Sequence, residues 1–225
     1  MLSQQRSLTN RACRLMSSMP LVEMREYLLK PADGPAYIAC TSETANLRKN
    51  LVPLRLFSTP DTGGTLNKAI HFYHYAGGIE ERDHVRGLQA KNKEWQEYMS
   101  IARPCMREQK SNIYAEAPFV SADSRIVGFE QEMLSAGPES PKCIYEIRKY
   151  QLKLGYDTVP RFLELYSRGL DSKLEAEGTC PSTSLCSVLY TGFDDCVLCL
   201  YVFILRLYLI PLHTFFHHNR DWLSQ

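Results

Sequence analysis

The side chains best suited to hold a ligand are arginines, tyrosines and one histidine that stand in pairs, two residues apart. The pairs are Arg25 and Tyr27, His71 and Tyr73, and Arg148 and Tyr150. Because side chains two apart in a β-strand point to the same face, each pair would present both of its groups together. Such a face could hold an anionic or quinone-like ligand by charge-assisted hydrogen bonds. The alternative is a self-satisfied network, in which Glu23 and Glu146 pair with the arginines.

A second group of residues has the spacing of a zinc site. Cys196-x2-Cys199 is followed by His213-x3-His217, as in two-Cys, two-His sites. The residues between the two pairs are nearly all apolar and lack the polar turn of a small zinc finger. We therefore predict no metal site. The chain also has no nucleophile elbow, phosphate loop or HExxH motif, so we expect no catalytic residues and no cofactor.

The arginine and tyrosine pairs lie in a segment that occurs twice. Residues 22–30 (VEMREYLLK) recur as residues 145–153 (YEIRKYQLK), with Glu, Arg, Tyr, Leu and Lys at identical places. Each copy alternates and is followed by Pro or Gly, which predicts a strand and then a turn. In the second copy, an apolar stripe at helical spacing from Val159 to Leu174 predicts that a helix follows.

The first copy continues with further predicted elements. Residues 36–49 are expected to be helical, residues 51–59 and 66–75 form strands joined by a Gly- and Pro-containing turn, residues 79–103 form a helix, and residues 111–119 form a last strand. This β-α-β-β-α-β order is the split βαβ of ferredoxin-like folds. Its first and third strands are neighbours, so the Arg25 and His71 pairs should converge.

The fold class that we predict is α+β, with tandem ferredoxin-like repeats of the dimeric α+β barrel type whose bare sheet faces pack together. The six paired side chains would then face the barrel interior. The second repeat is incomplete, because residues 185–191 supply at most one or two further strands and the expected pattern is lost after about residue 190. The predicted organisation is a leader at 1–19, a first repeat at 20–120, a linker at 121–141, a partial second repeat at 142–192 and an apolar tail at 193–225.

Both ends of the chain suggest contact with membranes or import machinery. Residues 1–19 contain three arginines and no acid, which is typical of a mitochondrial transit peptide; the alternative is a basic N-terminus without an address. Residues 196–216 form an apolar run with Arg206 at its middle, which costs about 2.5 to 3.5 kcal/mol in a bilayer. A membrane-embedded tail, a partly buried strand or helix pair and a non-native tail all remain open.

Overall composition excludes some classes of partner. Lys plus Arg (26) nearly balance Asp plus Glu (25), so no global field attracts nucleic acid. The eight cysteines are scattered and lack the dense spacing of a disulfide-stapled secreted domain. We expect reduced thiols and no nucleic-acid partner.

Four of these segments together resemble the NIPSNAP family of dimeric α+β barrel proteins. They are residues 23–31 (EMREYLLKP), 66–75 (LNKAIHFYHY), 93–97 (KEWQE) and 144–153 (IYEIRKYQLK). The resemblance spans about residues 21–178 and implies a mitochondrial protein that acts through protein–protein interaction. Its relatives are associated with mitochondrial quality control (mitophagy) and membrane or vesicle traffic. We expect protein partners at mitochondria, with homo-oligomers as an option because an incomplete repeat can pair with another chain.

The same resemblance implies an alternative function. Relatives with this barrel include haem-degrading and cofactor-free monooxygenases, which have no linear motif. The alternative is therefore a small-ligand-binding barrel with oxygenase-like or carrier activity.

Overall fold

The alternating residues of the first copy form strand β1 (Leu21–Leu29), and the predicted order of elements follows it. The computed structural model describes residues 19–62, 64–131, 143–153, 155, 157–172, 175, 183–191 and 196–204. The predicted leader, apart from Met19, and the histidines at 213 and 217 lie outside these residues. The other strands of the first repeat are β2 (Leu54–Ser58), β3 (Lys68–Tyr75) and β4 (Met106–Glu116).

Four helices belong to the first repeat, namely α2 (Gly34–Glu43), α3 (Ala45–Leu51), α4 (Gly78–Lys91) and α5 (Lys93–Ala102). Two 3-10 turns, Pro31–Asp33 and Arg103–Cys105, join them to β1 and β4. The single helix predicted over 79–103 is two helices because Asn92 has an extended backbone and its side chain accepts a hydrogen bond from the Trp95 amide at 2.8 Å. An asparagine in this position is a strong N-cap, so it starts a new helix.

The second repeat consists of β5 (Cys143–Gln151), α8 (Thr158–Arg168), β6 (Thr183–Thr191) and β7 (Cys196–Ile204). In chain order these match β1, the first helical segment, β2 and β3 of the first repeat. The described residues contain no counterpart of α4, α5 and β4 after β7. The fold is thus α+β with an incomplete second repeat, as the sequence predicts.

Residues 196–204, which the sequence assigns to an apolar tail, belong to the sheet of the second repeat. β7 pairs antiparallel with β5 over its whole length and with β6 on its other side. A strand with neighbours on both sides has its backbone hydrogen bonds satisfied, and its apolar composition suits such a central place. Within the described residues, no helix is long and apolar enough to cross a membrane.

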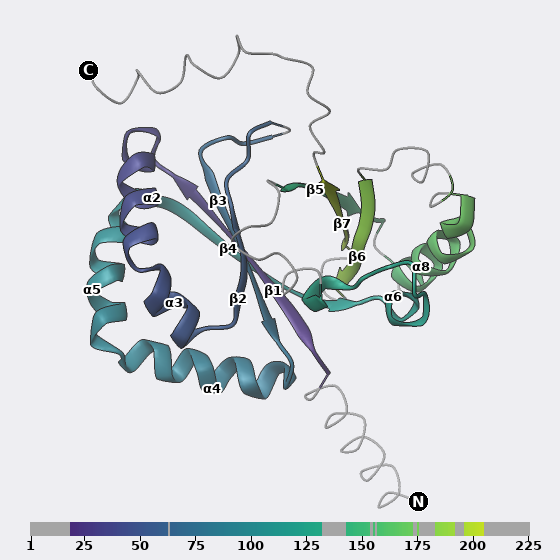
Figure 1. Ribbon diagram of the computed structural model, residues 1–225, viewed down its shortest axis with the longest axis horizontal. Coiled ribbons are helices and arrows are strands. Elements are labelled where there is room, and N and C mark those ends of the chain that lie inside the picture. The colour runs from purple at the N-terminus through teal and green to yellow at the C-terminus, as the bar shows by residue number, and fades with distance from the viewer. Residues whose placement is uncertain are drawn as a thin grey trace, which may run out of the picture.

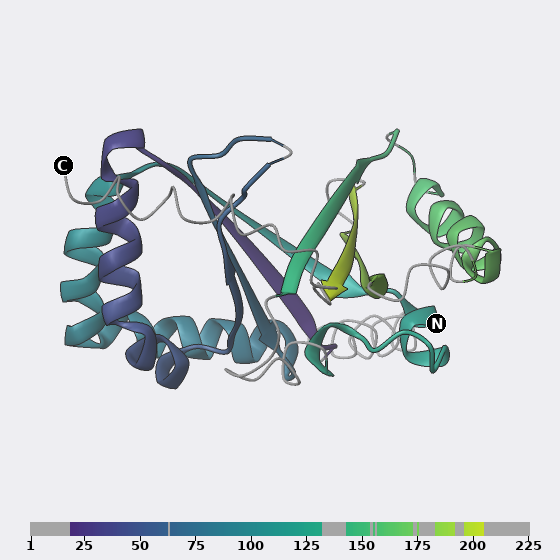
Figure 2. The ribbon, with the colours of Figure 1, turned by 45° about the horizontal axis from the view of Figure 1, so that its top comes forward.

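The two repeats share one seven-stranded sheet with the order β2-β3-β1-β4-β6-β7-β5. The junction is short, since β4 and β6 pair only at Ala115 with Tyr190 and at Glu116 with Leu189. Figures 1 and 2 show α2 to α5 packed on one side of the first repeat and α8 on the far side of the second. The described strands at the two ends of the sheet are β2 and β5.

Packing between the repeats is apolar and aromatic. The cluster there contains six fully buried side chains: Val22, Met24, Phe72, Tyr114, Phe129 and Leu189. Tyr145 and Ile147 of β5 pack against it. This interface cluster joins the repeats and fills the space between them.

The segment predicted as a linker also contributes to packing. Helix α6 (Pro118–Ala122) enters it, and Ile126 and Phe129 are 5% and 1% exposed. Ile126 packs against side chains of the second repeat, and Phe129 packs in the interface cluster. At least to residue 131, the segment is therefore part of the folded unit.

Candidate functional site

The structure brings four of the six predicted side chains together on one face of the sheet. In the antiparallel pairing of β1 and β3, Arg25 lies opposite His71 and Glu23 opposite Tyr73. The ring centroids of Tyr27 and His71 are 4.7 Å apart. These groups converge because strand side chains alternate and the two strands are neighbours.

That face is covered by helices and is not the barrel interior that the sequence predicts. Val22 and Met24, on the opposite face of β1, are buried in the interface cluster. Strand alternation then turns Glu23, Arg25 and Tyr27 toward the helices. The space between the two repeats is lined by apolar side chains. The polar side chains of β1 and β3 therefore lie on the opposite face of the sheet, where helices α3 and α4 supply charged partners.

Arg148 and Tyr150 lie apart from this group, on β5 of the second repeat. Arg148 donates from Nε to Glu146 Oε1 at 2.6 Å. The Tyr150 ring lies 5.5 Å from that of Phe162 on α8. The expected convergence of both repeats on one site is wrong, because each repeat turns its own polar face outward, away from the other.

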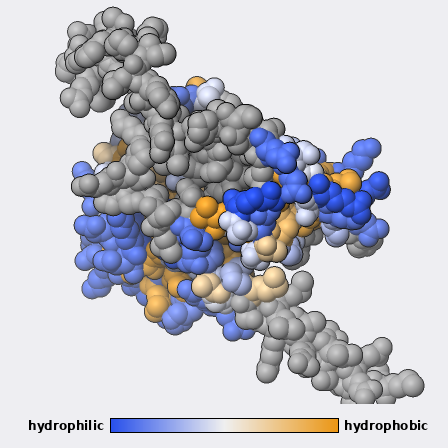
Figure 3. Space-filling model, turned by 45° about the vertical axis from the view of Figure 1, so that its right-hand side comes forward, coloured by the Kyte–Doolittle hydropathy of each residue, from blue (hydrophilic) through white to orange (hydrophobic). Residues whose placement is uncertain are grey.

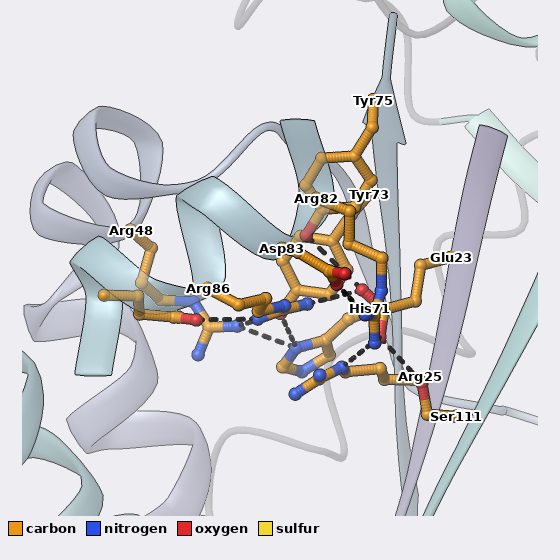
Figure 4. A network of polar contacts seen from close by, with 11 residues as sticks. Glu23, Arg25, Arg48, His71, Tyr73, Tyr75, Arg82, Asp83, Arg86 and Ser111 are labelled. Atoms are coloured by element: carbon orange, nitrogen blue, oxygen red, sulfur yellow. Dashed lines mark hydrogen bonds and ion pairs between the residues drawn. The ribbon is translucent and has the colours of Figure 1, made fainter. Parts of the chain in front are cut away.

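Glu23 is the centre of the polar set and is completely buried. Its two oxygens accept five hydrogen bonds (Figure 4): Arg25 Nε at 2.8 Å, Arg82 Nη2 at 3.1 Å and Ser111 Oγ at 2.7 Å reach Oε1, and Arg86 Nη2 at 2.7 Å and Tyr75 OH at 3.3 Å reach Oε2. Burial by itself raises the pKa of Glu23, but Arg86 and Arg25 outweigh it and hold this pKa well below its usual range. Glu23 is therefore a carboxylate at every physiological pH.

Arg48 of α3 forms a second polar centre and is only 2% exposed. Its guanidinium donates to Tyr98 OH at 2.6 Å, to His71 Nδ1 at 2.7 Å and to Tyr73 OH at 3.2 Å. It also lies over the rings of Trp95 and Tyr98, at 5.7 and 5.3 Å from their centroids. Among the described residues no carboxylate pairs with it, so hydroxyls, an imidazole and ring faces hold this charge.

His71 is neutral in this arrangement. Its Nδ1 accepts from Arg48, which leaves the proton on Nε2 to donate to Tyr37 OH at 3.2 Å. Burial and the neighbouring Arg48 both lower the pKa of His71. The ring therefore orients Tyr37 and Arg48 without carrying charge.

The neutral state of His71 predicts a specific loss of stability in acid. The unfolded chain binds a proton at His71 near pH 6.5 but the folded chain does not. The stability that neutral His71 contributes is therefore present above pH 6.5 and is lost as the pH falls below it. From pH 7.5 to pH 5.5, we expect His71 to lower the free energy of unfolding by about 1.4 kcal/mol. Urea unfolding of the wild type and of His71→Gln at both pH values measures this. An equal pH dependence in the two proteins would contradict a neutral His71, because all other histidines are common to both.

The two centres form one unit, which we call the arginine layer: Glu23, Arg25, Arg48, His71, Tyr73, Arg82 and Arg86. Arg86 links them because its guanidinium lies 4.6 Å from the ring centroid of Tyr73. Sequence reasoning missed Arg48, Arg82 and Arg86. The spacing of Arg82 and Arg86, four residues apart on α4, places them on one helix face and was a usable signal; for Arg48 no such pattern exists.

Two surface clefts lie elsewhere. One, of about 560 Å³, is lined by Trp95, Met99 and Arg103 with their neighbours on α4 and α5, and one of about 130 Å³ by Glu26, Lys68 and Glu108 with their neighbours. Neither includes any of the six predicted side chains. In the described part of the chain, no group of three His, Cys, Asp or Glu residues could hold a metal ion. What the arginine layer offers is a concentration of N–H donors and positive charge.

Part of the chain is similar to known proteins. Residues 22–121 match the family model NIPSNAP. The chain is 27% identical over 135 residues to the NipSnap homolog 3A proteins of Homo sapiens and Pongo abelii, which covers 59% of this chain and 48% of each relative. The chain thus spans about half the length of the curated relatives it matches.

Solved structures match as well. A NIPSNAP-like domain protein from Burkholderia xenovorans is 26% identical, covers 43% of this chain and 84% of its own, and gives a TM-score of 0.39. A putative monooxygenase from Lactobacillus acidophilus is 8% identical, covers 83% of this chain and 77% of its own, and gives a TM-score of 0.50. The second likeness concerns the fold alone and extends beyond the first repeat.

Proposed function

We propose that this protein, whose residues 22–121 match the NIPSNAP family model, acts at mitochondria by binding other proteins, in mitochondrial quality control (mitophagy) or in membrane or vesicle traffic. The observation that carries the proposal is that the described part of the second repeat is incomplete, so that β2 and β5 are the end strands of the described sheet. The backbone of an end strand can pair with a strand of a partner. Such a partner is another mitochondrial protein or a second copy of this chain.

A comparison of the two repeats supports the same conclusion. Glu23 and Arg25 lie under α4 with their side chains 0% and 17% exposed, whereas Glu146 and Arg148, at the matching positions of β5, are 37% and 43% exposed. The helices that cover the first pair have no described counterpart over the second. The outer face of β5 therefore offers charged groups to a partner.

Figure 3 shows hydrophilic residues next to apolar ones on the described surface of one face of the molecule. We expect contacts through strand pairing and charge.

The alternative function, a small-ligand barrel with oxygenase-like or carrier activity, has less support. A ligand in the barrel would need the space between the repeats, where apolar side chains such as Met24, Phe72 and Tyr114 are buried. We therefore favour protein interaction.

A localisation experiment tests the proposal first. We expect the full chain, fused at its C-terminus to a fluorescent protein, to enter mitochondria, and a chain lacking residues 1–19 to stay outside them, because the basic leader is the import signal. Replacing Arg6, Arg11 and Arg14 by Gln should act like the truncation. The same distribution of all three proteins would refute the leader.

Proximity labelling by the full chain in cells then tests the interaction. We expect the labelled mitochondrial proteins to include some that disappear with Arg148→Glu, which reverses a charge on the exposed face of β5. Arg168→Glu, on exposed α8, is the matched control and should leave the labelled set unchanged. Loss of the same proteins from both variants would argue against β5 as the contact.

A further inference from the structure

Hydrogen-bond donors exceed acceptors in the arginine layer. Each guanidinium has five N–H donors, while a carboxylate has about four acceptor sites in total. Glu23 already accepts five hydrogen bonds, three of them from Arg25, Arg82 and Arg86. Within the described structure, Nε of Arg82 and Nε of Arg86 are buried without any partner. Both of these unpaired atoms are hydrogen-bond donors, so the arginine layer lacks acceptors.

The balance of charge points the same way. Three arginines share Glu23, and the further acid that contacts them, Asp83, bonds Arg82 Nη1 at 2.9 Å and is 68% exposed. An exposed ion pair offsets little charge. Arg48 adds a fourth guanidinium with no acidic partner among the described residues. The layer therefore carries a net positive charge.

Solvent can reach these arginines from one side. The side chains of Arg25, Arg82 and Arg86 are 17%, 20% and 14% exposed. Ser111 of β4, opposite Arg25 in the sheet, and its neighbour Gln109 on the same face are both exposed. Figure 4 shows the guanidinium groups of Arg25, Arg82 and Arg86 approaching Glu23 from β1 and α4, with Ser111 on the strand side. Helices cover one side of the arginine layer. The side next to β4, at Ser111 and Gln109, is open to solvent, and we call it the open flank.

We propose that this open flank binds a phosphate-type dianion, with Arg25, Arg82 and Arg86 as its ligands. A phosphate monoester carries a charge of about −1.5 to −2 at neutral pH and has three acceptor oxygens. Guanidinium forks bind such oxygens in pairs. Three forks from different directions suit a tetrahedral group better than a single flat carboxylate. The phosphate belongs either to a soluble molecule or to a lipid headgroup; the site does not depend on the mitochondrial function proposed above.

Inorganic phosphate tests the site in its soluble form. We expect phosphate to raise the melting temperature of the full chain in a saturable way, beyond the effect of chloride at equal ionic strength. Arg82→Gln should weaken this binding about 10-fold or more, because it removes a charge-assisted donor. Arg125→Gln, which removes an exposed arginine paired with Asp123 and Asp171, should leave it unchanged. Melting without phosphate shows whether each variant is folded.

Two further variants keep the test decisive if Arg82→Gln does not fold. Arg25→Lys and Arg86→Lys each keep the charge but lose the fork; both should weaken phosphate binding. Binding of vesicles of phosphatidylcholine with and without phosphatidic acid identifies the source. Arg82-dependent binding to phosphatidic acid indicates a lipid, and binding of inorganic phosphate alone indicates a soluble molecule.

Two results would overturn the proposal. One is that neither phosphate nor phosphatidic acid binds the wild type. The other is that Arg125→Gln weakens binding as much as the variants of the arginine layer, which would mean that general surface charge is responsible.

Discussion

Replacing Glu23 by Gln is expected to lower the free energy of unfolding by about 3 to 5 kcal/mol. Gln keeps the size of the side chain but removes the one buried carboxylate that Arg25, Arg82 and Arg86 share. These guanidinium groups would then repel one another with fewer acceptors. Urea unfolding followed by circular dichroism measures the change. Since total stabilities are about 5 to 15 kcal/mol, this loss is a large fraction of the total.

The matching position in the second repeat provides the control. Glu146 pairs with Arg148 in the same strand, and both are more than a third exposed, so Glu146→Gln should cost less than about 1 kcal/mol. Equal effects of the two substitutions would show that the burial of Glu23 does not determine the loss of stability.

The loss in Glu23→Gln should also depend on pH. Because the pKa of Glu23 is lower in the folded than in the unfolded chain, its contribution is fully present above pH about 4.5 and is lost as the pH falls toward the folded value. The difference between wild type and variant should therefore shrink in acid.

Leu189→Ala is expected to lower the free energy of unfolding by about 2 to 5 kcal/mol, and to do so in both repeats at once. Leu189 belongs to β6 of the second repeat, is 0% exposed and packs in the interface cluster with Met24 and Phe72 of the first. Removal of its side chain leaves a cavity between the repeats. The fluorescence of Trp95, on α5 of the first repeat, should report the lower urea midpoint in a Trp222→Phe background.

Leu165→Ala is the control for this experiment. Leu165 is on α8 of the same repeat but is 55% exposed, so its truncation should change the free energy of unfolding by less than about 0.5 kcal/mol. A Trp95 midpoint that does not move in Leu189→Ala would mean that the repeats unfold independently, in contradiction to a shared core.

The incomplete second repeat links these results to function. Among the described residues no helix pair covers Glu146 and Arg148, and no further strand pairs with β5 at the end of the sheet. In the first repeat the equivalent Glu23 is 0% exposed and holds three arginines, so it serves stability. The same five-residue pattern therefore serves stability in one repeat and is available for contacts in the other.

Local pattern determined which residues form strands and which side chains share a face. The alternation of residues 22–30 and 66–75 specified that Arg25, Tyr27, His71 and Tyr73 point the same way, because the period of two is a property of the strand itself. The repeat of this pattern at residues 145–153 likewise predicted β5 and the tandem fold. Those features need no knowledge of what packs against the strand.

Tertiary packing decided which face the helices cover and which residues join the site. Both faces of β1 are buried, so alternation alone could not tell the barrel interior from the helix-covered side. Arg48 reaches His71 from another element, 23 residues away in the chain, and no local pattern encodes that contact. Residues 196–204 form β7 because β5 and β6 lie on either side to receive their hydrogen bonds. Only the assembled sheet distinguishes such a strand from an apolar tail.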